Sequence, residues 1–183
     1  DPKTKLGHEV KSGKIKSIDE ILDKGRKILE EEIVDSLLEV KSDLISIGQA
    51  KGKFGGGKRS IWKQTQKKTR EGNKPHFATM AIVGNKKGYV GIGYGKCKET
   101  IAAKEKAVVF AKKNILMIKR GCGDWGCFCG IAHSIPFSVE GKCGSVKVIL
   151  KPAPKGTGLV APDDVKKVLR LAGISDVWIK TFG

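Results

Sequence analysis

The stretch KRGCGDWGCFCGIAHSIP, residues 119–136, lies between two separate patterns of strands and helices. It contains three of the five cysteines and one of the three histidines of the chain. The residues before it predict a strand pair and a long basic helix, and the residues after it predict a second strand and helix pattern. We therefore interpret this stretch as a compact hinge between two small domains of the α+β class.

The hinge also places four potential metal ligands within 12 residues, namely Cys122, Cys127, Cys129 and His133. Thiolate and imidazole suit Zn²⁺, which is usually four-coordinate in structural sites. We predict a structural zinc site here, with Cys143 as an alternative ligand. Because the commoner Cys-x2-Cys knuckle is absent, four reduced and unligated side chains are an equally weighted alternative. A catalytic zinc is disfavoured, since four protein ligands leave no open position.

The charge of the chain indicates a polyanionic partner. Its 183 residues carry 36 lysines and arginines against 19 aspartates and glutamates, a net charge of +17. Such a surplus destabilises a compact protein by self-repulsion, which nucleic acid would relieve. A membrane is disfavoured, because no apolar run reaches about 18 residues and no amphipathic helix rich in aromatic anchors is visible. Five cysteines, an odd number, argue against a disulfide framework and for reduced thiols in the cytosol.

Residues 1–42 are assigned to an N-terminal tail and helices. Residues 1–16 are basic and lack periodicity, which predicts an extended tail. Ser17-Ile18-Asp19-Glu20 predicts a capping box, in which Ser17 and Glu20 satisfy backbone N–H groups of a short helix that ends near Gly25. Residues 29–40 predict a second helix.

Residues 43–118 are assigned to the first domain. A strand is predicted at Leu44–Ile47, followed by a hairpin of Phe77–Val83 and Tyr89–Tyr94. A helix is then predicted from about Lys98 to Ile118, with a buried face at helical spacing made of Ile101, Val108, Ala111 and Ile115.

Residues 119–134 form the predicted hinge, and residues 135–183 form the second domain. Its predicted hairpin pairs Ile135–Val139 with Ser145–Leu150. A helix capped by Asp163 is then expected to stop at Gly173, before a last strand around Val177–Thr181.

The segment KGKFGGGKRSIWKQTQKKTREGNKPH, residues 51–76, holds seven lysines, two arginines and five glycines. It is either a solvated disordered insert or a segment that orders against phosphates, with Phe54 and Trp62 as stacking surfaces. The loop LKPAPKGTGLVAP after the second hairpin is also expected to contact a phosphate backbone. The residues predicted to bind RNA are Lys53, Lys58, Arg59, Lys67, Lys68, Arg70, Lys74, Lys96, Lys119, Arg120, Lys151 and Lys155.

The sequence GIGYGK, residues 91–96, follows a strand and precedes a helix, as phosphate-binding loops do. It matches neither G-x-x-x-x-G-K-[ST] nor G-x-G-x-x-G, so a nucleotide site is disfavoured. We expect these glycines to allow close approach of the backbone to RNA or to the following helix.

Three stretches together resemble a known family. They are TREGNKPHFATMAIVGNKKGYVGIGYGKCKE (residues 69–99), GCGDWGCFC with the following His-Ser-Ile-Pro, and GKCGSVKVILKPAPKGTGLVAPDDVKKVLRLAGISDVW (residues 141–178). In this order they resemble small-subunit ribosomal protein five, and the cysteine-rich hinge resembles its archaeal branch. The resemblance covers roughly Ile33–Gly183 and also fits Pro2–Gly7.

That resemblance implies a first domain like the double-stranded-RNA-binding fold and a second domain of the ribosomal βαβ type. It implies a non-enzymatic role in the cytoplasmic ribosome, binding rRNA in the small subunit near the mRNA entrance and supporting subunit assembly and decoding accuracy. Small-subunit ribosomal proteins four and eight, and mRNA in the entry channel, are the implied partners. The turn Glu71-Gly72-Asn73-Lys74 falls where the family directs a basic loop toward RNA.

Two departures from the family pattern bear on these expectations. Residues 48–62 are longer than the pattern, and the family continues beyond Phe182-Gly183, which predicts a truncated or disordered end. The alternative function, from a different class, is a zinc- or nucleotide-dependent enzyme that acts on RNA. It is disfavoured because no acidic residue lies in a motif that would hold Mg²⁺.

Overall fold

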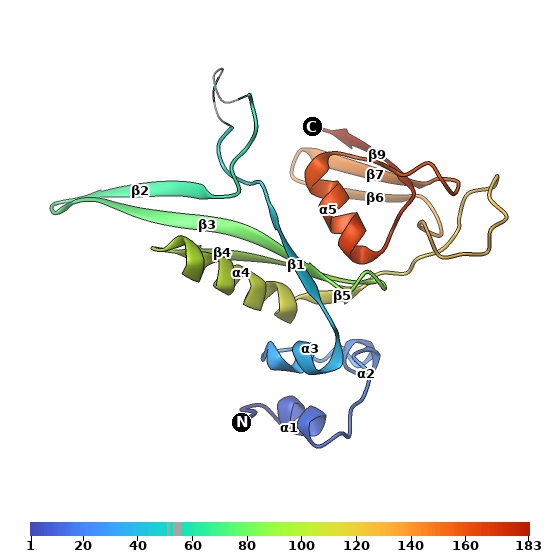
Figure 1. The fold of residues 1–183 in the computed structure, drawn as a ribbon, viewed down its shortest axis with the longest axis horizontal. Helices are drawn as coiled ribbons and strands as arrows, with labels where there is room; N and C mark the ends of the chain where they lie inside the picture. Colours follow the sequence, from blue (N-terminus) through green and yellow to red (C-terminus); the bar gives the residue numbers. More distant parts are fainter. Residues whose placement is uncertain (51, 53–55) are drawn as a thin grey trace. The chain divides into compact units, whose positions relative to one another are not determined.

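The computed structural model describes residues 1–50, 52 and 56–183, so the predicted contact of Lys53 lies outside the described residues. The chain divides into two compact units (Figure 1). Unit 1 consists of Asp1–Gly84 and Gly91–Leu116, and unit 2 of Asn85–Val90 and Met117–Gly183. Unit 1 combines several helices, and unit 2 one helix, with a mainly antiparallel sheet, which confirms the predicted α+β class with two small domains.

Unit 1 begins with three short helices, α1 (Lys5–Lys11), α2 (Asp19–Asp23) and α3 (Glu32–Leu37). The prediction of an extended tail over residues 1–16 is wrong, because the Thr4 side chain caps α1 by accepting from Gly7 N–H at 3.1 Å. The predicted capping box is also absent. Ser17 Oγ accepts from Asp19 N–H in a local turn, and α2 has Ile18 at its N-cap without a side-chain bond.

The first sheet contains β1 (Lys41–Ile45), β2 (Lys63–Thr69), β3 (Gly72–Gly84), β4 (Tyr89–Cys97) and β5 (Ile115–Met117). Its order is β1-β3-β4-β5, and β2 pairs with the other half of β3. The long β3 therefore has two antiparallel partners on one edge, β2 along Gly72–Ala78 and β1 along Met80–Gly84. Only the second half is buried, from Ala78 to Gly84 except Met80. The β2–β3 hairpin therefore extends away from the core of unit 1.

Helix α4 (Thr100–Lys113) packs against this sheet through small residues. Its buried side chains are Ala103, Ala107 and Ala111, whereas Ile101, predicted to be buried, is 71% exposed. The alanines meet Gly91, Gly93 and Gly95 of β4, and a Cβ on Gly93 would collide with the backbone of Ala107 and Ala111. The glycines of GIGYGK thus serve helix packing, one of the two roles expected for them. The predicted helix also ends early, since Ile115–Met117 forms β5.

Unit 2 contains β6 (Val139–Cys143), β7 (Val146–Pro152), β8 (Leu159–Val160), α5 (Asp163–Ala172) and β9 (Val177–Phe182), with sheet order β6-β7-β9-β8. The predicted hairpin is displaced along the chain. Its first strand, expected at Ile135–Val139, is β6 at Val139–Cys143, which lies mostly in the predicted turn between the two strands. Gly173 ends α5 at φ 81°, as predicted, while Pro162 rather than Asp163 occupies the N-cap. Among the described residues, no helix combines the length and apolar character needed to cross a membrane.

The glycine–alanine packing gives a direct test. We expect Gly93→Ala to lower the free energy of unfolding of unit 1 by about 1–3 kcal/mol, because the added methyl group overpacks the helix–sheet interface. The measurement is urea denaturation, with hydrogen exchange of the β3, β4 and α4 amides to assign the loss to unit 1. Gly141→Ala is the control, since a Cβ there meets nothing within 4 Å. Equal effects of the two substitutions would contradict the packing argument.

Candidate metal centre and nucleic-acid interface

The hinge folds into a closed loop whose two ends are hydrogen-bonded to each other. Gly121 N–H donates to Ser134 O at 2.9 Å, and Ser134 N–H donates back to Gly121 O at 2.8 Å. Gly123 N–H donates to Ile135 O at 3.2 Å, and a Cβ on Gly123 would collide with Pro136. The glycines therefore allow the two ends to approach closely, which places Cys122 beside His133.

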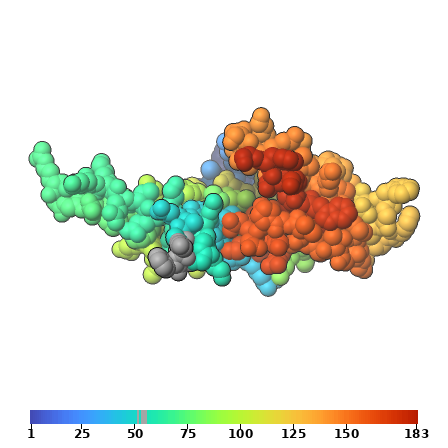
Figure 2. Space-filling view, turned by 90° about the horizontal axis from the view of Figure 1, so that it is seen from above, coloured from blue at the N-terminus to red at the C-terminus, as the bar shows by residue number. Residues whose placement is uncertain are grey.

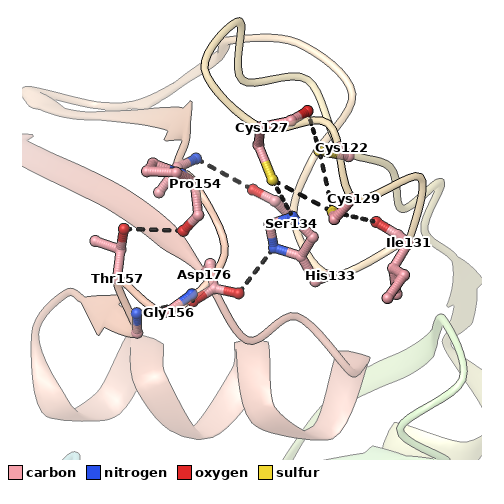
Figure 3. A network of polar contacts seen from close by, with 12 residues as sticks. Cys122, Cys127, Cys129, Ile131, His133, Ser134, Pro154, Gly156, Thr157 and Asp176 are labelled. Atoms are coloured by element: carbon pink, nitrogen blue, oxygen red, sulfur yellow. Dashed lines mark hydrogen bonds and ion pairs between the residues drawn. The ribbon is translucent and has the colours of Figure 1, made fainter.

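Cys122, Cys127, Cys129 and His133 point toward a common centre (Figure 3). Their ligand atoms all lie within 4.8 Å of one another. The sulfur of Cys129 lies 3.3 Å from that of Cys127 and 3.6 Å from that of Cys122, and Cys127 Sγ lies 3.5 Å from His133 Nε2. A tetrahedral zinc site would separate two sulfurs by about 3.8 Å, and a sulfur from a nitrogen by about 3.5 Å, given its bond lengths. The cluster is therefore close to the size of a four-coordinate metal site.

A buried carboxylate orients the imidazole of His133 by contacting the ring nitrogen that faces away from the sulfurs. His133 Nδ1 lies 2.8 Å from Asp176 Oδ2, and both side chains are only 6% exposed. The other oxygen, Asp176 Oδ1, accepts from Gly156 N–H at 3.1 Å and from Gly158 N–H at 2.8 Å (Figure 3). This network assigns the ring proton to Nδ1 and leaves the lone pair of Nε2 directed at the sulfurs. Carboxylates hold metal-ligating histidines in the same way.

The environment of the cluster gives Cys122 and Cys127 different pKa values. Hydrogen bonding by the backbone N–H of Lys155 and of Cys129 lowers the pKa of Cys127 to about 6. Hydrogen bonding with Cys127, together with burial, raises the pKa of Cys122 to about 11. In the metal-free protein one thiolate is therefore already formed at neutral pH, ready to act as a ligand.

The structure brings together the four predicted ligands and leaves out Cys143, which is exposed on β6. All five cysteines are free thiols in the structure. Asp176 was not predicted, because it is 43 positions from His133 and no spacing rule connects the two. The available signal was an acidic residue between two apolar residues, Ile174 and Val177, which the structure buries. The loop also presents Trp125 and Phe128, which are each 97% exposed.

Four of the predicted RNA-binding residues gather on the β2–β3 hairpin, which protrudes from unit 1 in Figure 2. Lys67 lies directly opposite Lys74 in the strand register, and Lys68 lies opposite Asn73. Arg70 lies in the two-residue turn before Gly72, whose φ is 111°. Like charges in opposite positions destabilise a hairpin. Among the described residues, Glu71 offsets them by pairing with Lys74 at 2.8 Å. A bound phosphate backbone would remove this repulsion.

The remaining predicted residues are distributed over both units. In unit 1, Lys58 and Arg59 are exposed beside an isolated bridge from Ala50 to Arg59, and Lys96 is exposed near the end of β4. In unit 2, Lys119, Lys151 and Lys155 are exposed. Their contacts with RNA stay predictions.

Arg120 has a structural role as well. Its guanidinium donates to the carbonyl oxygens of Lys86 at 3.4 Å, Lys87 at 3.0 Å and Gly173 at 3.2 Å. It therefore links the β3–β4 turn to the end of α5 within unit 2. An RNA contact by Arg120 would compete with these three bonds.

Comparison with known proteins agrees with this arrangement. The family model described as "Ribosomal protein S5, N-terminal domain" matches residues 61–119, and "Ribosomal protein S5, C-terminal domain" matches residues 141–183. The chain belongs to the ribosomal protein S5 family. The two matched domains flank the cysteine-rich loop, which lies between them in the sequence. The family resemblance inferred from the three sequence stretches is thereby confirmed.

Relatives within the family cover the whole chain. "Small ribosomal subunit protein uS5" of Nanoarchaeum equitans is 54% identical over 183 residues, which span all of this chain and 78% of the relative. The protein of the same name from Aeropyrum pernix is also 54% identical, with 77% of its length covered. The one from Methanocaldococcus jannaschii is 48% identical, with 78% covered. All three source organisms are archaea, as the cysteine-rich hinge suggested.

The pKa difference within the cluster can be measured by alkylation. In metal-free protein, the rate of iodoacetamide labelling of Cys127 should rise through about pH 6 and level off, because only the thiolate reacts. Labelling of Cys122 should still be rising at pH 9, because its pKa lies near 11. Mass spectrometry of the labelled peptides gives both profiles from one sample. Coincident profiles for the two cysteines would contradict the assignment.

Proposed function

We propose that this chain is a structural, non-enzymatic constituent of the small ribosomal subunit that binds rRNA through phosphate contacts. The full-length similarity to relatives named as small ribosomal subunit proteins carries the proposal. Membership of this family makes the chain a component of cytoplasmic ribosomes. It lies near the mRNA entrance, supports subunit assembly and decoding accuracy, and contacts small-subunit ribosomal proteins four and eight as well as incoming mRNA.

The distribution of charge supports rRNA as the main ligand. A net charge of +17 on 183 residues favours a polyanion. The β2–β3 hairpin concentrates Lys67, Lys68, Arg70 and Lys74 on strands that extend from the core, where opposed lysines repel in the absence of an anion. Lysines of this kind bind phosphates with little sequence preference and strong salt dependence.

The family also favours a structural role over the alternative of an RNA-acting enzyme. The glycine-rich GIGYGK segment lies in β4, with Gly91, Gly93 and Gly95 packed on α4, so they do not form a phosphate-binding loop. The cluster of three cysteines and His133 offers four protein ligands, so a four-coordinate metal bound there would have no free position for a substrate.

The hairpin makes a quantitative prediction. Replacing Lys67, Lys68, Arg70 and Lys74 together by Ala should weaken RNA binding uniformly across sequences. The slope of log affinity against log salt should fall by about 3–4, because each lost phosphate contact removes roughly 0.7–0.9. Fluorescence anisotropy with short RNAs at several salt concentrations measures both quantities. In reconstituted subunits, the variant should also translate structured messages less well than unstructured ones.

A charge-matched variant provides the control for this experiment. Lys14, Lys16, Lys24 and Lys27 are exposed near the N-terminal helices, and their replacement by Ala removes the same four charges. If both quadruple variants lose the same affinity, the effect reflects net charge, and the hairpin is not a specific contact. If structured messages are translated as well as by the parent, the role at the mRNA entrance is excluded.

We further propose that Cys122, Cys127, Cys129 and His133 hold one structural Zn²⁺. The donor set fits this ion, since three sulfurs and one imidazole nitrogen lie at separations near those of a tetrahedral site. The buried Asp176 fixes the imidazole with Nε2 toward the sulfurs. The ion would cross-link the glycine-rich loop between its hydrogen-bonded ends.

Metal analysis tests this site. Purified protein should contain one equivalent of zinc, and a chelator should loosen the loop, because ligation and local folding are coupled. Cys129→Ser should abolish stoichiometric binding, whereas Cys143→Ser should leave it unchanged. Asp176→Asn should weaken binding about 10- to 100-fold through loss of orientation. Well below one equivalent of metal, with all thiols freely titratable, would reject the site.

A further inference from the structure

The second sheet has two chemically different faces. The strand register aligns Lys147 with Phe182, Ile149 with Lys180, and Lys151 with Trp178 across β7 and β9. Because paired residues share a face, these six side chains lie on one side of the sheet. Glu140 and Lys142 of β6 join them through their pairing with Ile149 and Lys147.

The opposite face is mainly apolar and contributes to the core of unit 2. It carries Val148, Leu150, Val177 and Ile179, of which Val177 is fully buried. Figure 1 shows α5, the helix whose buried residues include Leu169 and Ala172, lying across one face of β6–β9. Val177 is the one fully buried residue of β6, β7 and β9, which assigns α5 to the apolar face. Among the described residues of unit 2, no helix covers the lysine-bearing face, called here the open face.

Aromatic and basic side chains alternate on the open face. Trp178 is 41% exposed and Phe182 is 48% exposed, and Lys180 between them lies 5.9 Å from the centre of the Phe182 ring. Lys142, Lys151 and Lys180 are exposed, while Lys147 pairs with Glu140 at 2.6 Å. The strands thus place four lysines and one glutamate around two exposed rings.

We propose that the open face is a second RNA-binding surface, on which an unpaired base stacks on Trp178 while the surrounding lysines contact the adjoining phosphates. This proposal rests on the rRNA binding proposed above and assigns it a site in unit 2. Of the residues on this face, only Lys151 was among those predicted from the sequence.

The charge of the face favours RNA over a protein partner. Three lysines remain after the Lys147–Glu140 pair, and a protein that covered them would have to supply matching carboxylates. Charged residues are depleted at the centres of protein interfaces, whereas lysines beside exposed aromatic rings are the usual composition of single-strand binding grooves.

The geometry also favours unpaired over paired nucleotides. A ring on a sheet face can stack only on a base whose own face is free, and the bases of a duplex are already stacked on one another. Alternate residues along β9 are about 6.6 Å apart, so Trp178, Lys180 and Phe182 form a short row suited to an extended strand. The tip of the hairpin of unit 1 differs, because its residues 67–74 are basic and include no aromatic side chain.

Tryptophan fluorescence can test stacking directly. The chain has three tryptophans, so Trp62→Phe and Trp125→Phe together leave Trp178 as the single emitter. This protein is titrated with a dye-labelled single-stranded oligoadenylate and with an RNA duplex of equal length, at low salt. Anisotropy of the dye reports binding, and Trp178 emission reports stacking. We expect the single strand to quench the emission with the same midpoint as the anisotropy change, and the duplex to bind without quenching.

Affinity measurements on variants provide the second arm. Trp178→Ala should weaken single-strand binding roughly 5- to 100-fold, as expected for loss of one stacked base, and Trp178→Phe should retain most of the affinity. Lys142→Gln with Lys180→Gln should reduce the salt slope by about 1.4 for a single strand. The matched control, Lys104→Gln with Lys106→Gln, removes two exposed charges from α4 and should leave single-strand quenching unchanged.

The outcomes separate this proposal from the proposed function. If RNA binds with unchanged Trp178 emission and Trp178→Ala keeps the parent affinity, the open face is not an RNA site, although rRNA binding stands. Equal quenching by single strand and duplex would contradict selection of unpaired bases. If neither RNA changes the anisotropy at low salt, the proposed rRNA binding fails together with this inference.

Discussion

The conformation of unit 2 around the hinge depends on one buried carboxylate. Asp176 accepts from the backbone N–H groups of Gly156 and Gly158 and from the His133 ring, and so connects the hinge, the loop after β7 and the start of β9. Burying an ionised carboxylate is costly unless its oxygens are hydrogen-bonded, and three donors satisfy this one. The backbone of His133 contributes as well, since its carbonyl oxygen accepts from Ser175 and Asp176 N–H. His133, which we propose as a metal ligand, and the turn before β9 are thereby held by the same contacts.

The sequence allowed prediction of features that depend on local spacing. The four ligands fall within 12 residues, so gathering them requires only a flexible loop, and the glycines between them supply it. The stop of α5 at Gly173 is likewise encoded by the residue that adopts the left-handed conformation. The family and the α+β class followed from ordered motifs, which do not require knowledge of any long-range contact.

Features that depend on contacts between distant residues were missed. Asp176 reaches His133 across 43 positions, and the buried face of α4 consists of alanines because glycines of β4 remove the space that larger side chains would fill. The predicted buried face of this helix was right at Ala111 and wrong at Ile101, which is exposed. The predicted helix was also too long, because Ile115 is buried as part of β5 and tertiary packing decided its place. The open face of the second sheet was missed because its composition becomes visible only when the strand register aligns three strands.

The glycine–alanine contact in unit 1 also limits how its two elements can change in length. Along β4 the glycines recur every second residue, about 6.6 Å apart, and along α4 the alanines recur every fourth residue, about 6.0 Å apart. Gly91 meets Ala111, Gly93 meets Ala107 and Ala111, and Gly95 meets Ala103 and Ala107, so the two rows run in opposite directions. The two repeats differ by about 0.6 Å per step and stay matched for only a few steps. Insertion of a single residue into α4 ahead of Lys106 would turn the following alanines by about 100° and present Lys106 and Phe110 to β4. Insertions and deletions are therefore expected to be tolerated in the loops on either side of this contact and excluded from within it.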